Sequence, residues 1–418
     1  MKVVAIADSD SYLKWAASTL AALPAEWERD LLLVDTPVAP SAAQTHAALA
    51  VSGIDVASVE RVPVASISER LAALRADVVL VATRGPVARV LIRLVGELPV
   101  RPVIVSGLPG ISIPATRKAL MFRVQADLFV LHSRREIRDF AAMSAANGWD
   151  HRFALATLPF IEQREAAGGT DLVFAAQAVV PSSRVDRLRV ARLLVDAARA
   201  DPARRVVVKV RAIRGERQTH DESDGYPDLL DELAVQSGLP ANLVISSEPM
   251  SAALDRAAGL VTVSSTALIE AIARQIPVIA LDTFGVSDEL INPVFEGSGL
   301  FGGEASVIGR EFRLPRIDWL DDNYFHPESA DDCATRLAEL VELRRRGELP
   351  ERAAVIKRGG RLRLAWERQR AFGGADRTVA GLAAVVVGVP ARVAVITGRR
   401  LTRRWRERAA AASAAKAA

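Results

Sequence analysis

The chain has 418 residues, half of them hydrophobic, and a single cysteine, Cys333. This length suits two domains, and one cysteine excludes both a disulfide framework and a cysteine zinc site. The net charge of +4 is uneven, because residues 351–418 carry 16 Lys and Arg against 4 Asp and Glu, whereas residues 1–350 have a net charge of −8. A nucleic-acid-binding protein more often spreads positive charge over its binding domain, so we predict no nucleic-acid partner.

The first half of the chain alternates apolar runs with amphipathic segments. The runs predict strands over 3–7, 30–34, 76–82, 101–105 and 126–131, and the amphipathic segments predict helices over 12–23, 86–96 and 134–147. Uninterrupted apolar runs such as 76–82 are typical of strands buried in a parallel sheet. The first strand follows Met1 almost at once, so we expect a cytoplasmic protein without a signal peptide.

The second half repeats this pattern after a polar segment, EQREAAGGT, at 162–170. Strands are predicted over 171–175, 205–210, 242–246 and 277–281, and helices over 184–200, 226–237 and 249–258. Two such halves predict an α/β protein with two doubly wound, Rossmann-like domains. We assign them to residues 1–161 and 171–330, with 162–170 as the linker, further helices over 331–375 and a basic helical C-terminal tail over 376–418.

The segment 260–282, LVTVSSTALIEAIARQIPVIALD, predicts a strand, a turn with Ser264, Ser265 and Thr266, a helix and a second, parallel strand. In open α/β sheets ligands lie beyond the carboxyl ends of the strands. A helix that begins there with free N–H groups and hydroxyls is a phosphate site, and Glu270, one turn on, is placed to reach a sugar hydroxyl. The alternative is that Ser265 or Thr266 only caps the helix.

Cations follow another strand of the second half. Lys209 and Arg211 can neutralise phosphate charge. Glu216 and His220, in the charged loop that follows, could contact a donor sugar, or the loop could simply be solvated. The chain has no Walker P-loop and no Gly-x-Gly-x-x-Gly after its first strand, and its five histidines are scattered. We therefore predict a nucleotide mono- or diphosphate pocket in the second domain, with no cofactor and no metal.

The first domain offers candidate catalytic bases. Asp8 and Asp10 follow the first predicted strand, and His132 ends the strand 126–131. A carboxylate or imidazole at a strand end can act as a general base. The alternatives are helix capping by Asp10 or Ser11 and a purely structural role for the histidine.

The C-terminal tail joins an apolar stretch to a basic one. Residues 382–396 are apolar but contain Gly388, Pro390 and Arg392, and they are too few to span a membrane. Six arginines between 399 and 408 surround Trp405, before the final AAAASAAKAA. This pattern suits the surface of an anionic membrane; the alternative is a solvated tail.

The sequence resembles known families at these motifs. The run VSSTALIEAIARQIPVIALD is similar to the serine-pair motif of bacterial capsule Kdo transferases, sialyltransferases and teichoic-acid polymerases, in which it binds the phosphate of a CMP-linked donor. Those families carry Lys-x-His-Pro where this chain has Lys209-Val210-Arg211-Ala212, so only the lysine matches. Together with ADSDSYLKW and SGLPGISIPATRK, residues 1–330 resemble an actinobacterial group described as glycosyltransferases.

The resemblance implies a metal-independent GT-B glycosyltransferase. It would move a sugar from a CMP- or UDP-linked donor in the second domain to a cell-envelope or capsule polysaccharide or lipid acceptor, at the inner face of the plasma membrane. The base would come from the first domain, with Asp10 favoured because it starts the first helix. Two other functions stay open: a nucleotide-sugar epimerase or hydrolase on the same fold, and a non-catalytic polysaccharide-assembly scaffold.

Overall fold

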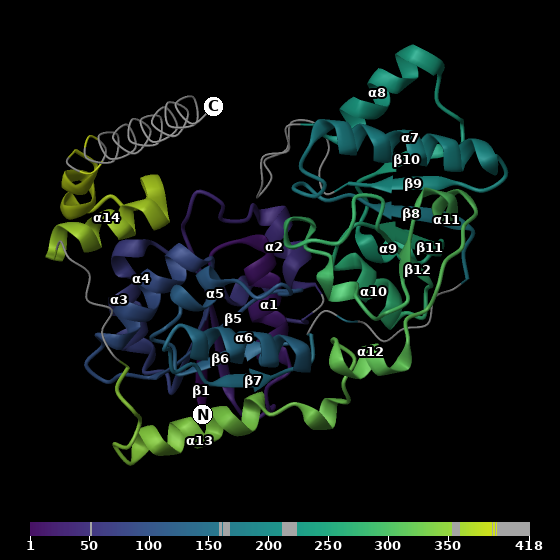
Figure 1. Cartoon of the computed structure of the whole chain (residues 1–418). Coiled ribbons are helices and arrows are strands. Elements are labelled where there is room, and N and C mark those ends of the chain that lie inside the picture. The colour runs from purple at the N-terminus through teal and green to yellow at the C-terminus, as the bar shows by residue number, and fades with distance from the viewer. Residues whose placement is uncertain are drawn as a thin grey trace, which may run out of the picture.

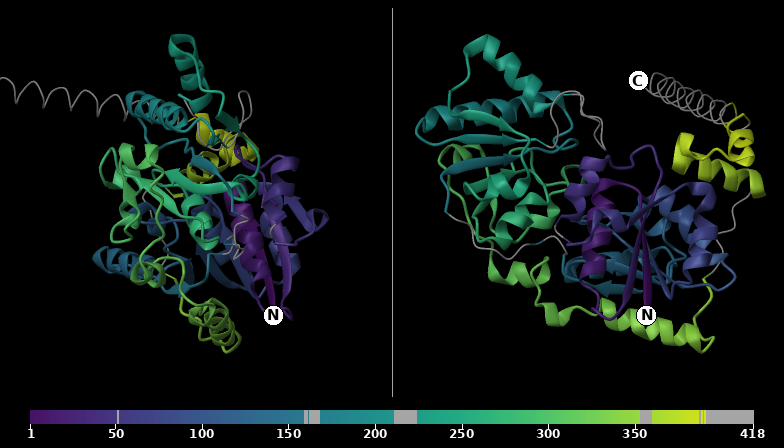
Figure 2. Two further views of the ribbon diagram at one scale, coloured as in Figure 1. Left: turned by 90° about the vertical axis from the view of Figure 1, so that its right-hand side faces the viewer. Right: turned by 180° about the vertical axis from the view of Figure 1, so that it is seen from behind.

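The computed structural model describes residues 1–50, 52–158, 161, 168–210, 224–352, 360–386, 388 and 390. Two parallel sheets form two lobes (Figures 1 and 2). The first has the order β3-β2-β1-β4-β5-β6-β7 and the second β10-β9-β8-β11-β12-β13. The two predicted doubly wound α/β domains are thereby confirmed. The strands of the first lobe are β1 (Lys2–Ala7), β2 (Glu28–Val34), β3 (Val59–Val62), β4 (Val78–Ala82), β5 (Val103–Gly107), β6 (Leu128–Leu131) and β7 (Phe153–Leu155).

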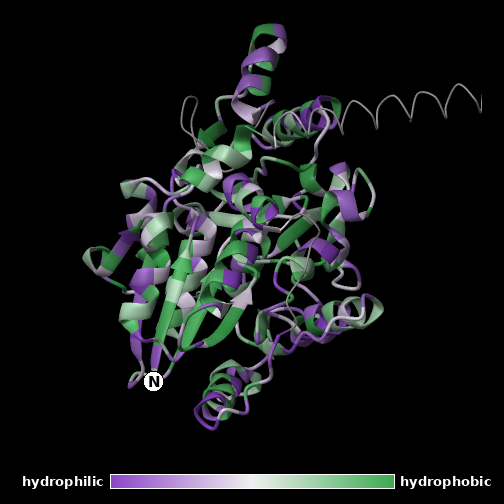
Figure 3. Cartoon of the chain, turned by 90° about the vertical axis from the view of Figure 1, so that its left-hand side faces the viewer, coloured by the Kyte–Doolittle hydropathy of each residue, from purple (hydrophilic) through white to green (hydrophobic). Residues whose placement is uncertain are grey.

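The first sheet is covered on both faces, and its inner strands β4 (VVLVA) and β6 (LFVL) are apolar and buried at every position. In β1, Val3 and Ala5 pack with α1 in one cluster, whereas Val4 and Ile6 pack with α4 in another, as the two-residue period of a strand requires. Figure 3 shows the hydrophobic colour of these inner strands. The helices of this lobe are α1 (Asp10–Ala21), α2 (Ala42–Leu49), α3 (Ile67–Leu74), α4 (Gly85–Gly96), α5 (Arg117–Met121) and α6 (Arg134–Ala146).

The second lobe has the same layered plan. Its strands are β8 (Asp171–Ala175), β9 (Val206–Lys209), β10 (Leu243–Ser246), β11 (Ala257–Thr262), β12 (Val278–Leu281) and β13 (Phe301–Gly302). Its helices are α7 (Arg184–Ala200), α8 (Tyr226–Ser237), α9 (Met250–Leu254), α10 (Ala267–Ala273), α11 (Glu304–Ile308) and α12 (Ile317–Asp322). The helix predicted over 249–258 is wrong in its last residues, because Ala257 already pairs with Asp171 of β8.

The C-terminal helices belong to the first lobe. From α13 (Cys333–Arg345), Cys333, Leu337 and Val341 enter the core beneath α1. From α14 (Gly360–Phe372), Phe372 is buried in the core beside α4. Figures 1 and 2 show the chain returning beneath the first lobe as α13 and reaching its far side as α14. The segment predicted as separate helices thus completes the first lobe.

Several predicted features lie outside the described residues: Arg211, Glu216 and His220, most of the linker, and positions 391–418 of the tail. Of the linker, Gly168 to Thr170 lead into β8. A Cβ atom at Gly169 would lie 1.9 Å from the Arg256 carbonyl oxygen, so only glycine fits there. No helix in the described part of the chain is long and apolar enough to cross a membrane.

Candidate active site

The predicted phosphate-binding residues of the second lobe lie at the carboxyl ends of the strands of its sheet. Lys209 ends β9 opposite Ala175 of β8, and Thr262 of β11 donates to the Ala175 carbonyl from the other side at 3.0 Å. Lys209 and the turn 264–266 therefore flank the carboxyl end of β8. Lys209 is buried, and its ammonium group donates to the Val210 carbonyl.

Gln177, which follows β8, holds the serine turn in place. Its Oε1 accepts from the Ser264 backbone N–H at 2.9 Å, and its Nε2 donates to Ser264 Oγ at 3.1 Å. Ser264 is buried, so its hydroxyl positions the turn from inside. The sequence analysis did not select Gln177 as a site residue; the available signal was an amide two residues after the end of β8, where β11 also ends.

The expectation of free N–H groups at the start of α10 is wrong for Ala267 and the three residues that follow it. Ser265 Oγ accepts from Ala267 N at 3.2 Å, and the Ser265 carbonyl accepts from Leu268 N at 3.0 Å. The Thr266 carbonyl accepts from Ile269 N and Glu270 N. A tight first turn thus satisfies the donors that a longer helix opening would expose. Thr266 is the N-cap residue, but its side chain makes no capping bond, so its hydroxyl is the group that the turn does not use.

The turn lies at the junction of the lobes. Thr266 Cγ2 is 3.1 Å from the position of a Cβ atom at Gly110, in the first-lobe loop that follows β5. Beside this contact, Ile113 and Leu158 of the first lobe pack in one apolar cluster with α10. Ser265, Thr266 and Glu270 are partly exposed. Of the predicted binding residues, Thr266 therefore faces the first lobe across the junction.

Two carboxylates of the first lobe have different surroundings. Asp8 is fully buried and pairs with Arg84, accepting from its Nε at 2.8 Å and its backbone N–H at 3.1 Å. Burial raises the pKa of Asp8, although the Arg84 cation opposes the shift. Asp10 is partly exposed and is the first residue of α1, whose N-cap is Ser9 rather than Asp10 or Ser11. Of the two, Asp10 is the one a substrate can reach.

His132 is enclosed by the first lobe. Its Nε2 accepts from Trp15 Nε1 at 2.8 Å, and its Nδ1 lies 2.8 Å from the Ala156 carbonyl, which can only accept. The ring is therefore neutral with the proton on Nδ1. Burial lowers the pKa of His132 to about 4. With both nitrogens bonded inside the protein, the structural role left open by the sequence fits this geometry better than catalysis.

This burial makes the stability of the protein depend on pH. Because the folded pKa lies below the usual 6.5, His132 stabilises the fold above pH 6.5 and loses that contribution as the pH falls toward 4. We compare the free energy of unfolding of the wild type with that of His132→Gln. We expect the difference between them, wild type minus variant, to be about 2 kcal/mol smaller at pH 5 than at pH 7. Urea titrations at both values measure this. The gap should stay constant between pH 7 and 8.5; a constant gap down to pH 5 would contradict the assignment.

Glu136, in the first turn of α6, is a buried carboxylate that sequence reasoning missed. It accepts from Ser112 N at 2.8 Å, His132 N at 2.9 Å and Tyr324 Oη at 2.6 Å. Burial raises the pKa of Glu136, and burial beside this carboxylate raises that of Tyr324 well above its usual value. Since Ser112 belongs to the loop that faces Thr266 and Tyr324 follows α12, Glu136 fixes the first-lobe wall of the junction.

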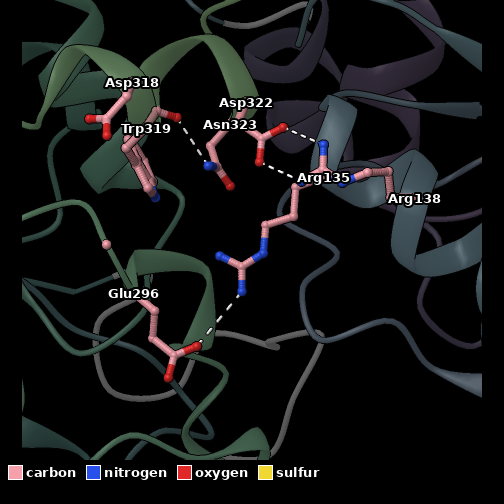
Figure 4. Close-up of a pocket in the computed structure, with 8 residues that line it drawn as sticks. Arg135, Arg138, Glu296, Asp318, Trp319, Asp322 and Asn323 are labelled. Carbon is pink, nitrogen blue, oxygen red and sulfur yellow. Dashed lines mark hydrogen bonds and ion pairs between the residues drawn. The ribbon is translucent and has the colours of Figure 1, made fainter.

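A hollow of about 420 Å³ lies between α6, α12 and residues 296–297 (Figure 4). Arg138 forms a two-pronged ion pair with Asp322 at 2.5 and 2.6 Å, and Arg135 lies 3.8 Å from Glu296. Asn323 Oδ1 is buried without a donor among the described residues. Because carboxylates already face both arginines, this pocket suits a phosphate poorly.

Comparison with known proteins places these features in a family. The model of the family described as "Putative glycosyltransferase (DUF6716)" matches residues 3–340. The chain belongs to this family. The matched range covers both sheets and most of α13, but not α14. No curated protein matches the chain.

Two solved structures share the arrangement of this family member. A Listeria monocytogenes protein described as a "putative UDP-N-acetylglucosamine 2-epimerase" has 13% identity and a TM-score of 0.53, over 85% of this chain and 99% of its own. MnaA of S. aureus, solved with UDP, has 12% identity and a TM-score of 0.51, over 85% of this chain and all of its own. At such low identity the likeness establishes the fold alone, two Rossmann-like lobes in the GT-B arrangement.

Proposed function

We propose that this chain transfers a sugar from a CMP- or UDP-linked donor to a cell-envelope or capsule polysaccharide or lipid acceptor. The position of Thr266 carries the proposal: it faces the first lobe across the junction, and its side chain makes no capping bond. Lys209 supplies a cation on the same sheet edge. The family description supports glycosyl transfer, and MnaA shows that a protein of this fold was solved with UDP.

In this proposal the second lobe stabilises the leaving nucleotide. Breaking the bond to the sugar leaves negative charge on phosphate oxygens, which cations and hydroxyls stabilise by charge-assisted hydrogen bonds. We assign this role to Lys209, Arg211, Ser265 and Thr266, with Ser264 holding the turn and Glu270 binding a ribose or sugar hydroxyl. The mechanism uses no metal or cofactor. Glu216 and His220 stay predictions as donor-sugar contacts.

The acceptor hydroxyl needs a base from the first lobe. Asp10 is our first choice, because Asp8 is ion-paired to Arg84 and His132 has no lone pair facing the junction. As the acceptor oxygen attacks the anomeric carbon, Asp10 would take its proton. We place this reaction at the inner face of the plasma membrane because of the basic C-terminal region.

Product analysis tests the function. The purified chain is incubated with CMP- and UDP-sugars, with and without a lipid or glycan acceptor, and the products are analysed by mass spectrometry. A transferase makes a glycosylated acceptor only when the acceptor is present. Free or isomerised sugar without acceptor would instead support the epimerase or hydrolase alternative. The Listeria protein, described as a putative epimerase, has the same fold. A scaffold would bind no nucleotide and turn over nothing.

Hydroxyl deletions test the phosphate site. Thr266→Val removes one unused hydroxyl and should weaken nucleotide binding by roughly fivefold to tenfold, the value of one hydrogen bond.

Ser264→Ala with Ser265→Ala should weaken binding and also destabilise the fold by about 1–2 kcal/mol, because those hydroxyls bond Gln177 and Ala267 N. Calorimetric titration with UDP and CMP measures both effects. Thr116→Val, at the N-cap of α5 and also without a capping bond, is the control; unchanged affinity in Thr266→Val and in the double variant would remove the assignment.

A further inference from the structure

We propose that the C-terminal hairpin, α14 together with residues 376–386, docks the protein on an anionic lipid bilayer through its exposed face. The inference deepens the proposed location at the membrane and does not depend on the nucleotide chemistry.

The hairpin is a fixed part of the first lobe. Phe372 is buried in the core beside α4, and Asp376, also buried, accepts from Arg368 Nε at 2.9 Å and from Thr378 Oγ1 at 2.7 Å. A Cβ atom at Gly388 would lie 2.3 Å from the Trp366 ring, so the second arm packs closely on the first. Lipid bound by this hairpin would therefore hold the whole first lobe.

The outer face of the second arm is apolar. Residues 379–386 are helical, and Val379, Leu382 and Val386 are 84%, 58% and 74% exposed. Their spacing of three and four residues places them on one stripe, while Ala384 is buried. Leu362 of α14 is also half exposed. Several large apolar side chains gathered on one hairpin indicate a binding surface.

Exposed cations accompany these apolar side chains. Arg361, Arg363, Arg370 and Arg377 are all exposed, and only Glu367 and Asp376 supply carboxylates between positions 352 and 406. Arginine with leucine and valine is the composition that inserts at a charged lipid surface. A second copy of the same hairpin would present like charges and repel it, so we assign the surface to anionic lipid.

The uneven charge of the chain also orients the protein on the bilayer. Residues 1–350 have a net charge of −8, whereas residues 351–418 have a net charge of +12. An anionic bilayer therefore attracts the end that carries the hairpin and repels the remainder. Figure 1 places α14 on the side of the first lobe that is remote from the second lobe, so docking there leaves the junction between the lobes uncovered.

Vesicle binding tests the proposal with the full chain. We expect co-sedimentation with phosphatidylcholine vesicles containing one quarter phosphatidylglycerol, and little with pure phosphatidylcholine. Val379→Asp with Leu382→Asp should weaken binding roughly tenfold or more, because two apolar contacts are lost and two like charges face the lipid. The matched control is Val185→Asp with Val235→Asp, two valines of the second lobe that are 76% and 90% exposed, and it should bind like the wild type.

Equal binding by the two double variants would overturn the proposal, as would equal binding to neutral vesicles or self-association without lipid. Nucleotide titration of the same proteins in solution separates this inference from the proposed function. The hairpin variant should keep its nucleotide affinity and lose its vesicle binding. A chain that binds vesicles as expected but no nucleotide would contradict only the proposed function.

Discussion

Replacing Lys209 by methionine is expected to weaken nucleotide binding by about 10- to 100-fold. A charge-assisted hydrogen bond contributes about 1.5–3 kcal/mol, and each 1.4 kcal/mol corresponds to a factor of ten. Lys209 is buried at the end of β9, on the edge that also carries Thr266. Methionine keeps the unbranched apolar stem, so the core around β9 should be preserved while the cation is lost. Calorimetric titration with UDP, CMP, CDP and GDP measures the effect.

Lys118→Met is the matched control for this variant. Lys118 is an exposed cation on α5 of the first lobe, so its loss changes the net charge equally without touching the second sheet. A local phosphate contact predicts that only Lys209→Met loses affinity. Equal losses in the two variants would show a general electrostatic effect and would count against the assigned site. High salt should weaken wild-type binding as well, since the contact is ionic.

Replacing Glu136 by leucine is expected to destabilise the protein by at least about 3 kcal/mol. The change leaves Ser112 N, His132 N and the Tyr324 hydroxyl without their acceptor inside the protein, and each unsatisfied buried group costs about 1–3 kcal/mol. Removal of a buried polar group, whose transfer out of water is costly, offsets part of this loss. Chemical denaturation measures the difference. Tyr324→Phe removes one of the three bonds and should cost about 1 kcal/mol.

The pH dependence of this stability difference tests whether the carboxyl group of Glu136 causes it. Because burial raises the pKa of Glu136, its contribution to stability is full below its unfolded pKa and falls as the pH rises through the folded one. The free energy of unfolding of the wild type should therefore exceed that of Glu136→Leu by a larger amount at pH 5 than at pH 7. If this difference in free energy of unfolding became smaller at low pH, Glu136 would be ionised and well stabilised in the fold, which would contradict the raised pKa.

Sequence patterns predicted those elements whose ends carry local signals. Residues 171–175, 184–200 and 226–237 fold as predicted, the last ending before Gly238, whose positive φ allows the helix to stop. The predicted helix 249–258 was too long because alanines at 257 and 258 suit a helix as well as a strand, and pairing with β8 decides between them.

The candidate site was less predictable, because its contacts join distant segments. Asp8 meets Arg84 across 76 residues, and Tyr324 meets Glu136 across 188. A glutamate in the first turn of a helix favours the interpretation of a capping or solvated residue, so nothing local marks Glu136 as buried. Likewise, the apolar stripes of α13 and α14 indicate that a surface covers them but not that it belongs to the first lobe.

A crystal structure of the chain with bound UDP or CMP is the most direct test of the proposed donor site. We expect phosphate oxygens within hydrogen-bond distance of Thr266 Oγ1 and Lys209 Nζ, at the carboxyl ends of the strands of the second sheet and facing Gly110. Phosphate bound instead beside Asp8 and Arg84 at the edge of the first sheet, or in the hollow between α6 and α12, would contradict this expectation.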